Sequence, residues 1–136
     1  MQIHGACHCG QVAFTAEIDP ASVMICNCTD CQTLSGAPFR TIARASIESF
    51  KLAGQTKTYV KVAESGNPRA QVFCPECGTP LYSSAVQDPP HVTIRLGCVA
   101  ERAQLKPAVQ LWQRSAAPWL PEIGGIPGVP AQLPPA

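Results

Sequence analysis

The sequence has no excess of charge of either sign, no long apolar run and no internal repeat. Ten Lys and Arg residues stand against nine Asp and Glu residues, which gives a formal charge of +1. This balance excludes a protein that attracts nucleic acid or an anionic membrane through a strongly basic surface. No window approaches the roughly 18 apolar residues of a membrane span, and no repeat has the period of a solenoid.

The first residues, MQIHGACHCG, also lack the basic stretch and following apolar run of a secretory signal peptide. We therefore expect a soluble, cytoplasmic protein with no nucleic-acid or membrane partner. At 136 residues, the chain has the size of one domain and is long enough to bury a hydrophobic core.

Short segments of alternating apolar and polar residues predict an all-β fold with little helix. Each segment is rich in β-branched or aromatic residues and is bounded by Gly or Pro, as strands are. These candidate strands are residues 11–18, 56–62, 69–73, 91–96 and 109–112. One short helix is expected at residues 29–34.

The C-terminal end differs in composition from the rest of the chain. Six prolines follow in its last nineteen residues: Pro118, Pro121, Pro127, Pro130, Pro134 and Pro135. Because proline lacks a backbone N–H, we expect neither a helix nor a central strand there. We expect Trp119, Leu120 and Ile123 to attach the start of this segment to the body. The sequence thus predicts a domain at residues 1–120 and a Pro-rich tail at 121–136.

Eight cysteines are the most informative feature of the sequence. In a reducing compartment they are typical of metal sites or catalytic thiols, although the even count leaves a disulfide framework as an alternative. Seven of them form a CxC pair, a CxCxxC cluster and a CxxC pair. In chain order these groups are Cys7 and Cys9; Cys26, Cys28 and Cys31; Cys74 and Cys77.

The two pairs together supply the four sulfurs of a closed zinc site. In an extended segment, Cys7 and Cys9 point to the same side, while His8 faces away. In CPECG the proline fixes φ and the glycine permits a positive φ, so the sulfurs of Cys74 and Cys77 converge. A tetrahedral four-sulfur zinc site would staple the N-terminal strand to a segment about 65 residues later. The CxCxxC cluster is an alternative source of two of these ligands.

The remaining cluster, Cys26, Cys28 and Cys31, is one ligand short of a closed site. Three protein ligands with an open fourth position are typical of a zinc ion that binds substrate. An iron–sulfur cluster is a weaker alternative, because the spacing differs from the usual ferredoxin runs. In another interpretation the cluster closes with Cys98, a histidine or water and is purely structural. Otherwise Cys98 is expected to be a small buried thiol.

Four motifs, taken together and in order, resemble the glutathione-dependent formaldehyde-activating enzyme family, also called the centromere protein V/Gfa domain. They are GACHCGQVAF, CNCTDCQTLSGAPF, FCPECGTPLY and PAVQLWQRSAAPW, and the similarity spans residues 5–119. One position departs from the family pattern, because Gln110 stands where the family often has a histidine.

The resemblance implies an Mss4-like fold of packed antiparallel sheets with two zinc ions per chain. It implies a structural zinc on Cys7, Cys9, Cys74 and Cys77. It also implies a second zinc on Cys26, Cys28 and Cys31, where the thiol of glutathione binds. The implied activity is the addition of glutathione to formaldehyde, a carbon–sulfur lyase reaction in reverse.

An anionic thiol on a three-cysteine zinc site requires cations nearby, and arginine suits carboxylates. The candidates are Arg40, Arg44, Arg69 and Arg95, of which Arg40 follows the cluster most closely. Asp30 is a candidate proton acceptor or substrate contact, or else it caps the turn after the cysteines. We hypothesise a lyase-type enzyme acting on a small thiol and a small aldehyde. A thiol carrier without turnover and a zinc-stapled interaction module are the alternatives.

Overall fold

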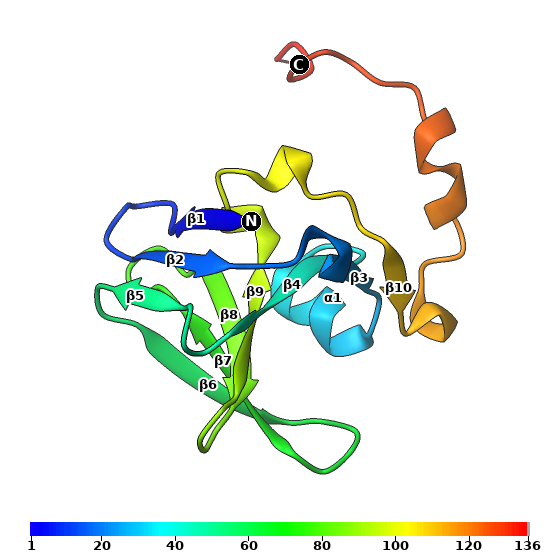
Figure 1. The fold of residues 1–136 in the computed structure, drawn as a ribbon. Coiled ribbons are helices and arrows are strands. Elements are labelled where there is room, and N and C mark those ends of the chain that lie inside the picture. Colours follow the sequence, from blue (N-terminus) through cyan, green and yellow to red (C-terminus); the bar gives the residue numbers. More distant parts are fainter. Residues whose placement is uncertain (136) are drawn as a thin grey trace.

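The computed structural model describes residues 1–135 and contains two sheets (Figure 1). The smaller sheet has the order β1-β2-β5 and is antiparallel. Its strands are β1 (Gln2–Ala6), β2 (Ala13–Glu17) and β5 (Lys51–Ala53). The mainly β fold with antiparallel sheets, predicted from the alternating segments and from the resemblance, is confirmed.

The larger sheet has the order β10-β3-β4-β9-β8-β7-β6. In that order the strands are β10 (Val109–Leu111), β3 (Met24–Cys26), β4 (Arg40–Ser46), β9 (His91–Arg95), β8 (Pro80–Ala85), β7 (Pro68–Phe73) and β6 (Lys57–Val62). Neighbours are antiparallel, except that β10 pairs in parallel with β3 and places Leu111 opposite Cys26. A late segment of the chain therefore lies beside the three-cysteine cluster.

One short α-helix, α1 (Thr29–Ser35), follows β3 directly, as the sequence predicted. The remaining helical segments are 3-10 turns: η1 (Pro20–Ser22), η2 (Leu96–Cys98), η3 (Arg102–Gln104), η4 (Gln113–Ser115) and η5 (Leu120–Gly125). None of the helices within residues 1–135 has the length and apolar character to cross a membrane.

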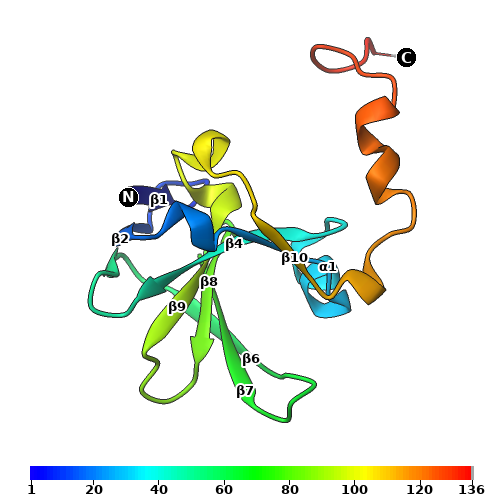
Figure 2. The ribbon, with the colours of Figure 1, turned by 45° about the vertical axis from the view of Figure 1, so that its right-hand side comes forward.

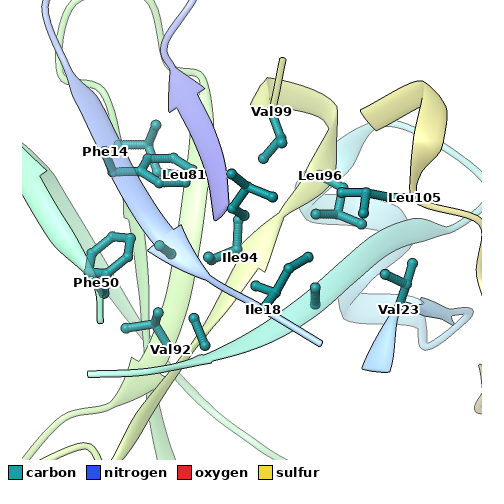
Figure 3. Packing of buried hydrophobic residues seen from close by; sticks show 14 of the residues in the cluster. Phe14, Ile18, Val23, Phe50, Leu81, Val92, Ile94, Leu96, Val99 and Leu105 are labelled. Carbon is teal, nitrogen blue, oxygen red and sulfur yellow. The ribbon is translucent and has the colours of Figure 1, made fainter. Parts of the chain in front are cut away.

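The hydrophobic core lies between β1 and β2 of the small sheet and the middle of the large sheet (Figure 3). Alternate residues of β1 and β2 are buried, so each strand presents one apolar face. In Figure 3, Phe14 of β2 and Ile18, the residue that follows this strand, project toward Leu81, Val92 and Ile94 of the large sheet. This packing fixes the loop after β1 close to the turn before β8.

Gly5 lies in β1 directly opposite Phe14 of β2. A Cβ atom at Gly5 would be 2.0 Å from Cζ of the Phe14 ring, which is itself buried. The ring therefore covers the glycine, and no larger residue fits without displacing a core aromatic.

We expect Gly5→Ala to lower the free energy of unfolding by about 1–3 kcal/mol, because overpacking forces the Phe14 ring to move. Denaturant unfolding of the full chain measures this loss. Gly97→Ala is the matched control, since a Cβ atom there meets nothing within 4 Å. Equal losses in the two variants would contradict this explanation.

The start of the tail departs from the prediction. Residues Leu120–Gly125 form the 3-10 helix η5, which a proline in its first turn allows, since that position needs no N–H donor. Of the three residues expected to attach it to the body, Trp119 and Ile123 are exposed and Leu120 is half-buried. Figures 1 and 2 show this segment pointing away from both sheets. The domain boundary at residue 120 remains a prediction.

Candidate metal centres and the adjoining pocket

Four cysteines meet where the loop between β1 and β2 faces the turn between β7 and β8. The sulfur atoms of Cys7, Cys9, Cys74 and Cys77 all lie within 4.8 Å of one another. The Cys7–Cys9 and Cys9–Cys74 sulfur pairs are 3.5 and 3.7 Å apart. Zinc bonded to four sulfurs at ~2.3 Å sets tetrahedral sulfur–sulfur edges of about 3.8 Å. The four donors therefore fit a closed zinc site.

The CxC pair lies in a tight turn, and the prediction of an extended segment there is wrong. The Gly10 N–H donates to the Cys7 carbonyl at 3.0 Å, and Gly10 has a φ of 80°. The chain must reverse here because β1 and β2 form a hairpin. The Val12 N–H donates to the Cys7 sulfur at 3.2 Å, which orients that thiol.

The CPECG turn has the conformation that its sequence predicted. Gly78 has a φ of 73°, and its N–H donates to the Cys74 carbonyl at 2.9 Å. The Thr79 hydroxyl oxygen accepts from the His8 N–H at 3.0 Å and lies 3.1 Å from the Cys77 sulfur. Thr79 thus joins the two loops that carry the four sulfurs.

Protons are shared unequally among these four thiols. The Thr79 side chain lowers the pKa of Cys77 to about 5. A backbone hydrogen bond at Gln11 lowers the pKa of Cys9, but the Cys7 thiol and burial outweigh it and raise that pKa to about 12. Four thiolates so close together repel one another, so full deprotonation requires a cation at their centre.

The second cluster consists of three cysteines at the end of β3 and the start of α1. The sulfur atoms of Cys26, Cys28 and Cys31 lie within 4.8 Å of one another, and no histidine, carboxylate or fourth cysteine joins this group within residues 1–135. Cys28 is the N-cap of α1, and its sulfur accepts from the Cys31 N–H at 3.3 Å. The helix start therefore fixes two of the three sulfurs.

Hydrogen bonding between the Cys26 and Cys31 side chains lowers the pKa of Cys26 to about 5 and raises the pKa of Cys31. The cluster shares its protons as the four-sulfur cluster does, and its donor set also fits zinc. Cys98 lies outside both clusters, and its thiol contacts the Arg95 carbonyl at 3.1 Å. It is half-buried, and burial raises its pKa to about 11.

A pocket of about 460 Å³ opens beside the three-cysteine cluster. Its floor contains buried side chains from four strands: Cys26 of β3, Ile42 of β4, Ser83 of β8, and Thr93 and Arg95 of β9. Its rim includes Asp30, Lys61, Glu64, Trp112 and Arg114. The three sulfurs therefore face a cavity large enough for a small molecule.

Charged side chains close the rim in pairs. Lys61 of β6 donates to Asp30 of α1. Arg114 donates to both carboxylate oxygens of Glu64 at 3.0 and 3.1 Å. The Arg114 guanidinium also lies 4.8 Å from the centre of the Trp112 ring, a cation–π contact. Asp30 is thus a rim residue in an ion pair, and the cap of α1 is Cys28 instead.

The predicted arginines take different places around the cluster. Arg69 and Arg95 line the pocket, whereas Arg44 is exposed on β4 and lines none of the described cavities. Arg40 is buried and pairs with Cys26 across β3 and β4, but it lines two neighbouring cavities rather than this one. Its role as a substrate contact remains a prediction.

The segment Trp112–Ser115 forms one wall of the pocket, and sequence reasoning missed its role. Trp112 has a φ of 56°, a left-handed conformation that is rare for an aromatic residue. The one sequence signal for this wall was the PAVQLWQRSAAPW motif, none of whose residues was predicted to belong to the site. Gln110 contacts Asn27, whose amide also donates to the Leu111 carbonyl at 3.1 Å.

Gln32 of α1 connects the cysteine loop to this wall. Its side-chain amide donates to the Asn27 carbonyl at 2.8 Å and to the Ser115 carbonyl at 2.9 Å. We expect Gln32→Leu to lower the free energy of unfolding by about 1–3 kcal/mol, because two carbonyls lose their donor. Thermal and denaturant unfolding test this, with the exposed Gln104→Leu as the control. A Gln32 variant as stable as the control would contradict it.

The fold and the two clusters define a class: mainly β proteins with a cluster of four cysteines and a cluster of three, each of which could hold a metal ion. Residues 2–115 match the family described as "Glutathione-dependent formaldehyde-activating enzyme". The match covers more than half of the sequence, so the chain belongs to this family, and the resemblance seen in the four motifs is confirmed.

The fold also occurs in a solved structure. A crystal structure of a protein from Rhodobacter sphaeroides superposes with a TM-score of 0.60 and 18% sequence identity. The similarity covers 79% of this chain and 99% of that chain. At this identity it supports the fold alone. None of the curated proteins compared with the chain matches it significantly.

Proposed function

We propose that this protein is a zinc-dependent carbon–sulfur lyase-type enzyme that adds glutathione, or a similar small thiol, to a small aldehyde such as formaldehyde. One observation carries the proposal: three clustered sulfurs face a pocket, while the other four close on themselves. A cluster with an open position beside a cavity is suited to substrate, and a closed one to structure.

The cysteines take two roles in this proposal. Cys26, Cys28 and Cys31 hold the second zinc ion, and the four-sulfur cluster holds the structural one. A zinc ion bound there supplies Lewis acidity that keeps a thiol deprotonated at neutral pH. In the reaction a carbon–sulfur bond forms at the carbonyl carbon, and the oxygen gains the thiol's proton. The product with formaldehyde is S-(hydroxymethyl)glutathione.

The pocket's own residues bind and orient the thiol. Lys61 and Arg114 at the rim suit the carboxylates of glutathione, and Asp30 and Glu64 suit its ammonium group. Burial of the floor excludes water from the reacting atoms and strengthens these charge interactions. Arg40, which lies opposite Cys26 on the neighbouring strand and outside the pocket, offsets the negative charge of the cluster.

The test replaces zinc with cobalt in the full chain, whose visible absorption reports on thiolate ligands at the open site. We expect glutathione to change this spectrum at saturable concentration, and the zinc form to accelerate hemithioacetal formation, measured by NMR exchange. Binding without acceleration would favour the thiol carrier. If neither is observed, the proposal fails and the interaction module, with its Pro-rich tail or exposed strand as contact surface, is favoured.

A further inference from the structure

Three arginines around the three-cysteine cluster have no carboxylate partner in the described part of the chain: two of them line the pocket, and Arg40 lies outside it. Within residues 1–135, no Asp or Glu oxygen lies within the 4.0 Å of a salt bridge to Arg40, Arg69 or Arg95. Arg95 is only 8% exposed, and its guanidinium donates to the Gln71 side chain at 2.9 Å. A buried guanidinium without a carboxylate is costly, so its location next to the cluster calls for an anion.

The three-cysteine cluster accounts for part of this positive charge. Three thiolates around a divalent ion leave one negative charge, and a bound substrate thiolate makes it two. Arg69 and Arg95 in the pocket and Arg40 outside it together carry three positive charges against these two. The rim is neutral, because Asp30 is paired with Lys61 and Glu64 with Arg114. The surroundings of the cluster therefore hold one more positive charge than the cluster and a bound thiolate balance.

Two hydroxyl groups line the same pocket as Arg95. Ser83 and Thr93 face each other across β8 and β9, and both line the floor. Both residues are buried, at 5% and 9% exposure. Within residues 1–135 neither hydroxyl has a hydrogen-bond partner, and neither hydroxyl oxygen is fully enclosed by protein. Two hydroxyl donors next to a guanidinium form a suitable binding site for a small oxyanion such as a carboxylate.

We propose that the carbonyl substrate of this site carries a carboxylate next to its carbonyl carbon, as glyoxylate does, and that Arg95, Ser83 and Thr93 bind that carboxylate. This rests on the proposed thiol addition. The thiol sulfur bonds to the carbonyl carbon, the π electrons move to the oxygen, and the oxygen takes the thiol's proton. The product is a hemithioacetal that retains its carboxylate.

The number of bonds from the sulfur distinguishes this carboxylate from the two carboxylates of glutathione. In such a product the carboxylate is two bonds from the sulfur, whereas both carboxylates of glutathione are many bonds away. An arginine that shares the floor with Cys26 suits the near carboxylate. The exposed charges at the rim suit the distant ones.

The test compares glyoxylate with formaldehyde as partners of glutathione on the zinc-loaded full chain. We expect glyoxylate to react at least tenfold more efficiently. Arg95→Gln should lower the glyoxylate rate by about tenfold or more, as loss of a charged hydrogen bond does, and should lower the formaldehyde rate by clearly less. Arg95→Lys should restore part of the glyoxylate rate. Lys51→Gln, an exposed charge on β5, is the control.

A binding measurement covers the case in which the buried Arg95 variant does not fold. NMR titration should show that glycolate binds at the pocket at least fivefold more tightly than neutral glycolamide. Arg69→Gln, at a half-buried site, should reduce that preference. Formaldehyde preferred over glyoxylate, or no glycolate preference, would overturn the inference while leaving the thiol addition intact. An Arg95 variant that weakens only glutathione binding would also overturn it and assign Arg95 to glutathione.

Discussion

Replacing Cys74 with serine should remove one zinc ion per chain and abolish cooperative unfolding near room temperature. Cys74 is fully buried, and its sulfur lies 3.7 Å from that of Cys9. The four-sulfur cluster joins the β1–β2 loop to the β7–β8 turn, so its loss frees both from the core. Because the unfolded chain has no preformed site, the free energy of zinc binding adds to the stability of the folded chain. We therefore expect a large share of the roughly 5–15 kcal/mol that stabilises a domain to be lost.

Zinc content by elemental analysis and unfolding followed by circular dichroism measure the two effects. Cys98→Ser is the matched control, because this half-buried cysteine belongs to neither cluster. We expect the control to keep two zinc ions and most of its stability. A Cys74 variant with full zinc content, or one as stable as the control, would show that the four sulfurs do not hold a structural ion.

The second large effect is expected for Cys28→Ser, which should lose thiol binding while keeping the fold. A serine at the N-cap of α1 still accepts the Cys31 N–H, and serine is among the preferred N-cap residues. The helix start therefore survives, but a metal ion bound at the cluster would lose one of its three thiolate ligands. We expect zinc content to fall from two ions to one, and glutathione-dependent turnover to fall by at least about 100-fold.

The control for this variant is Thr33→Ser, an exposed change in the same helix. Circular dichroism should show equal folding of both variants, and only Cys28→Ser should lose the response of the cobalt spectrum to glutathione. If Cys28→Ser keeps two zinc ions and full turnover, the three-cysteine cluster is not the reacting centre.

The sequence predicted that the cysteines within each motif converge, because their spacing is local, whereas the combination of Cys7 and Cys9 with Cys74 and Cys77 came from the resemblance. CPECG contains its own turn residues, and α1 follows directly from CNCTDC. It did not predict β4 or β8, whose Ala and Ser residues lack clear alternation and whose burial patterns come from neighbours on both faces. Nor did it show that Trp112–Ser115 forms a pocket wall, because that depends on the parallel pairing of β10 with β3.

The same pairing has a consequence for the order in which the protein is made. Leu111 lies opposite Cys26, so the ribosome must add 85 further residues after the first cysteine of the cluster before its wall can form. At roughly 5–20 residues per second, this takes about 4–17 s. During that interval the three thiols are already synthesised but unshielded. Oxidants and competing thiophilic metals can then reach these thiols without the obstacle of that wall.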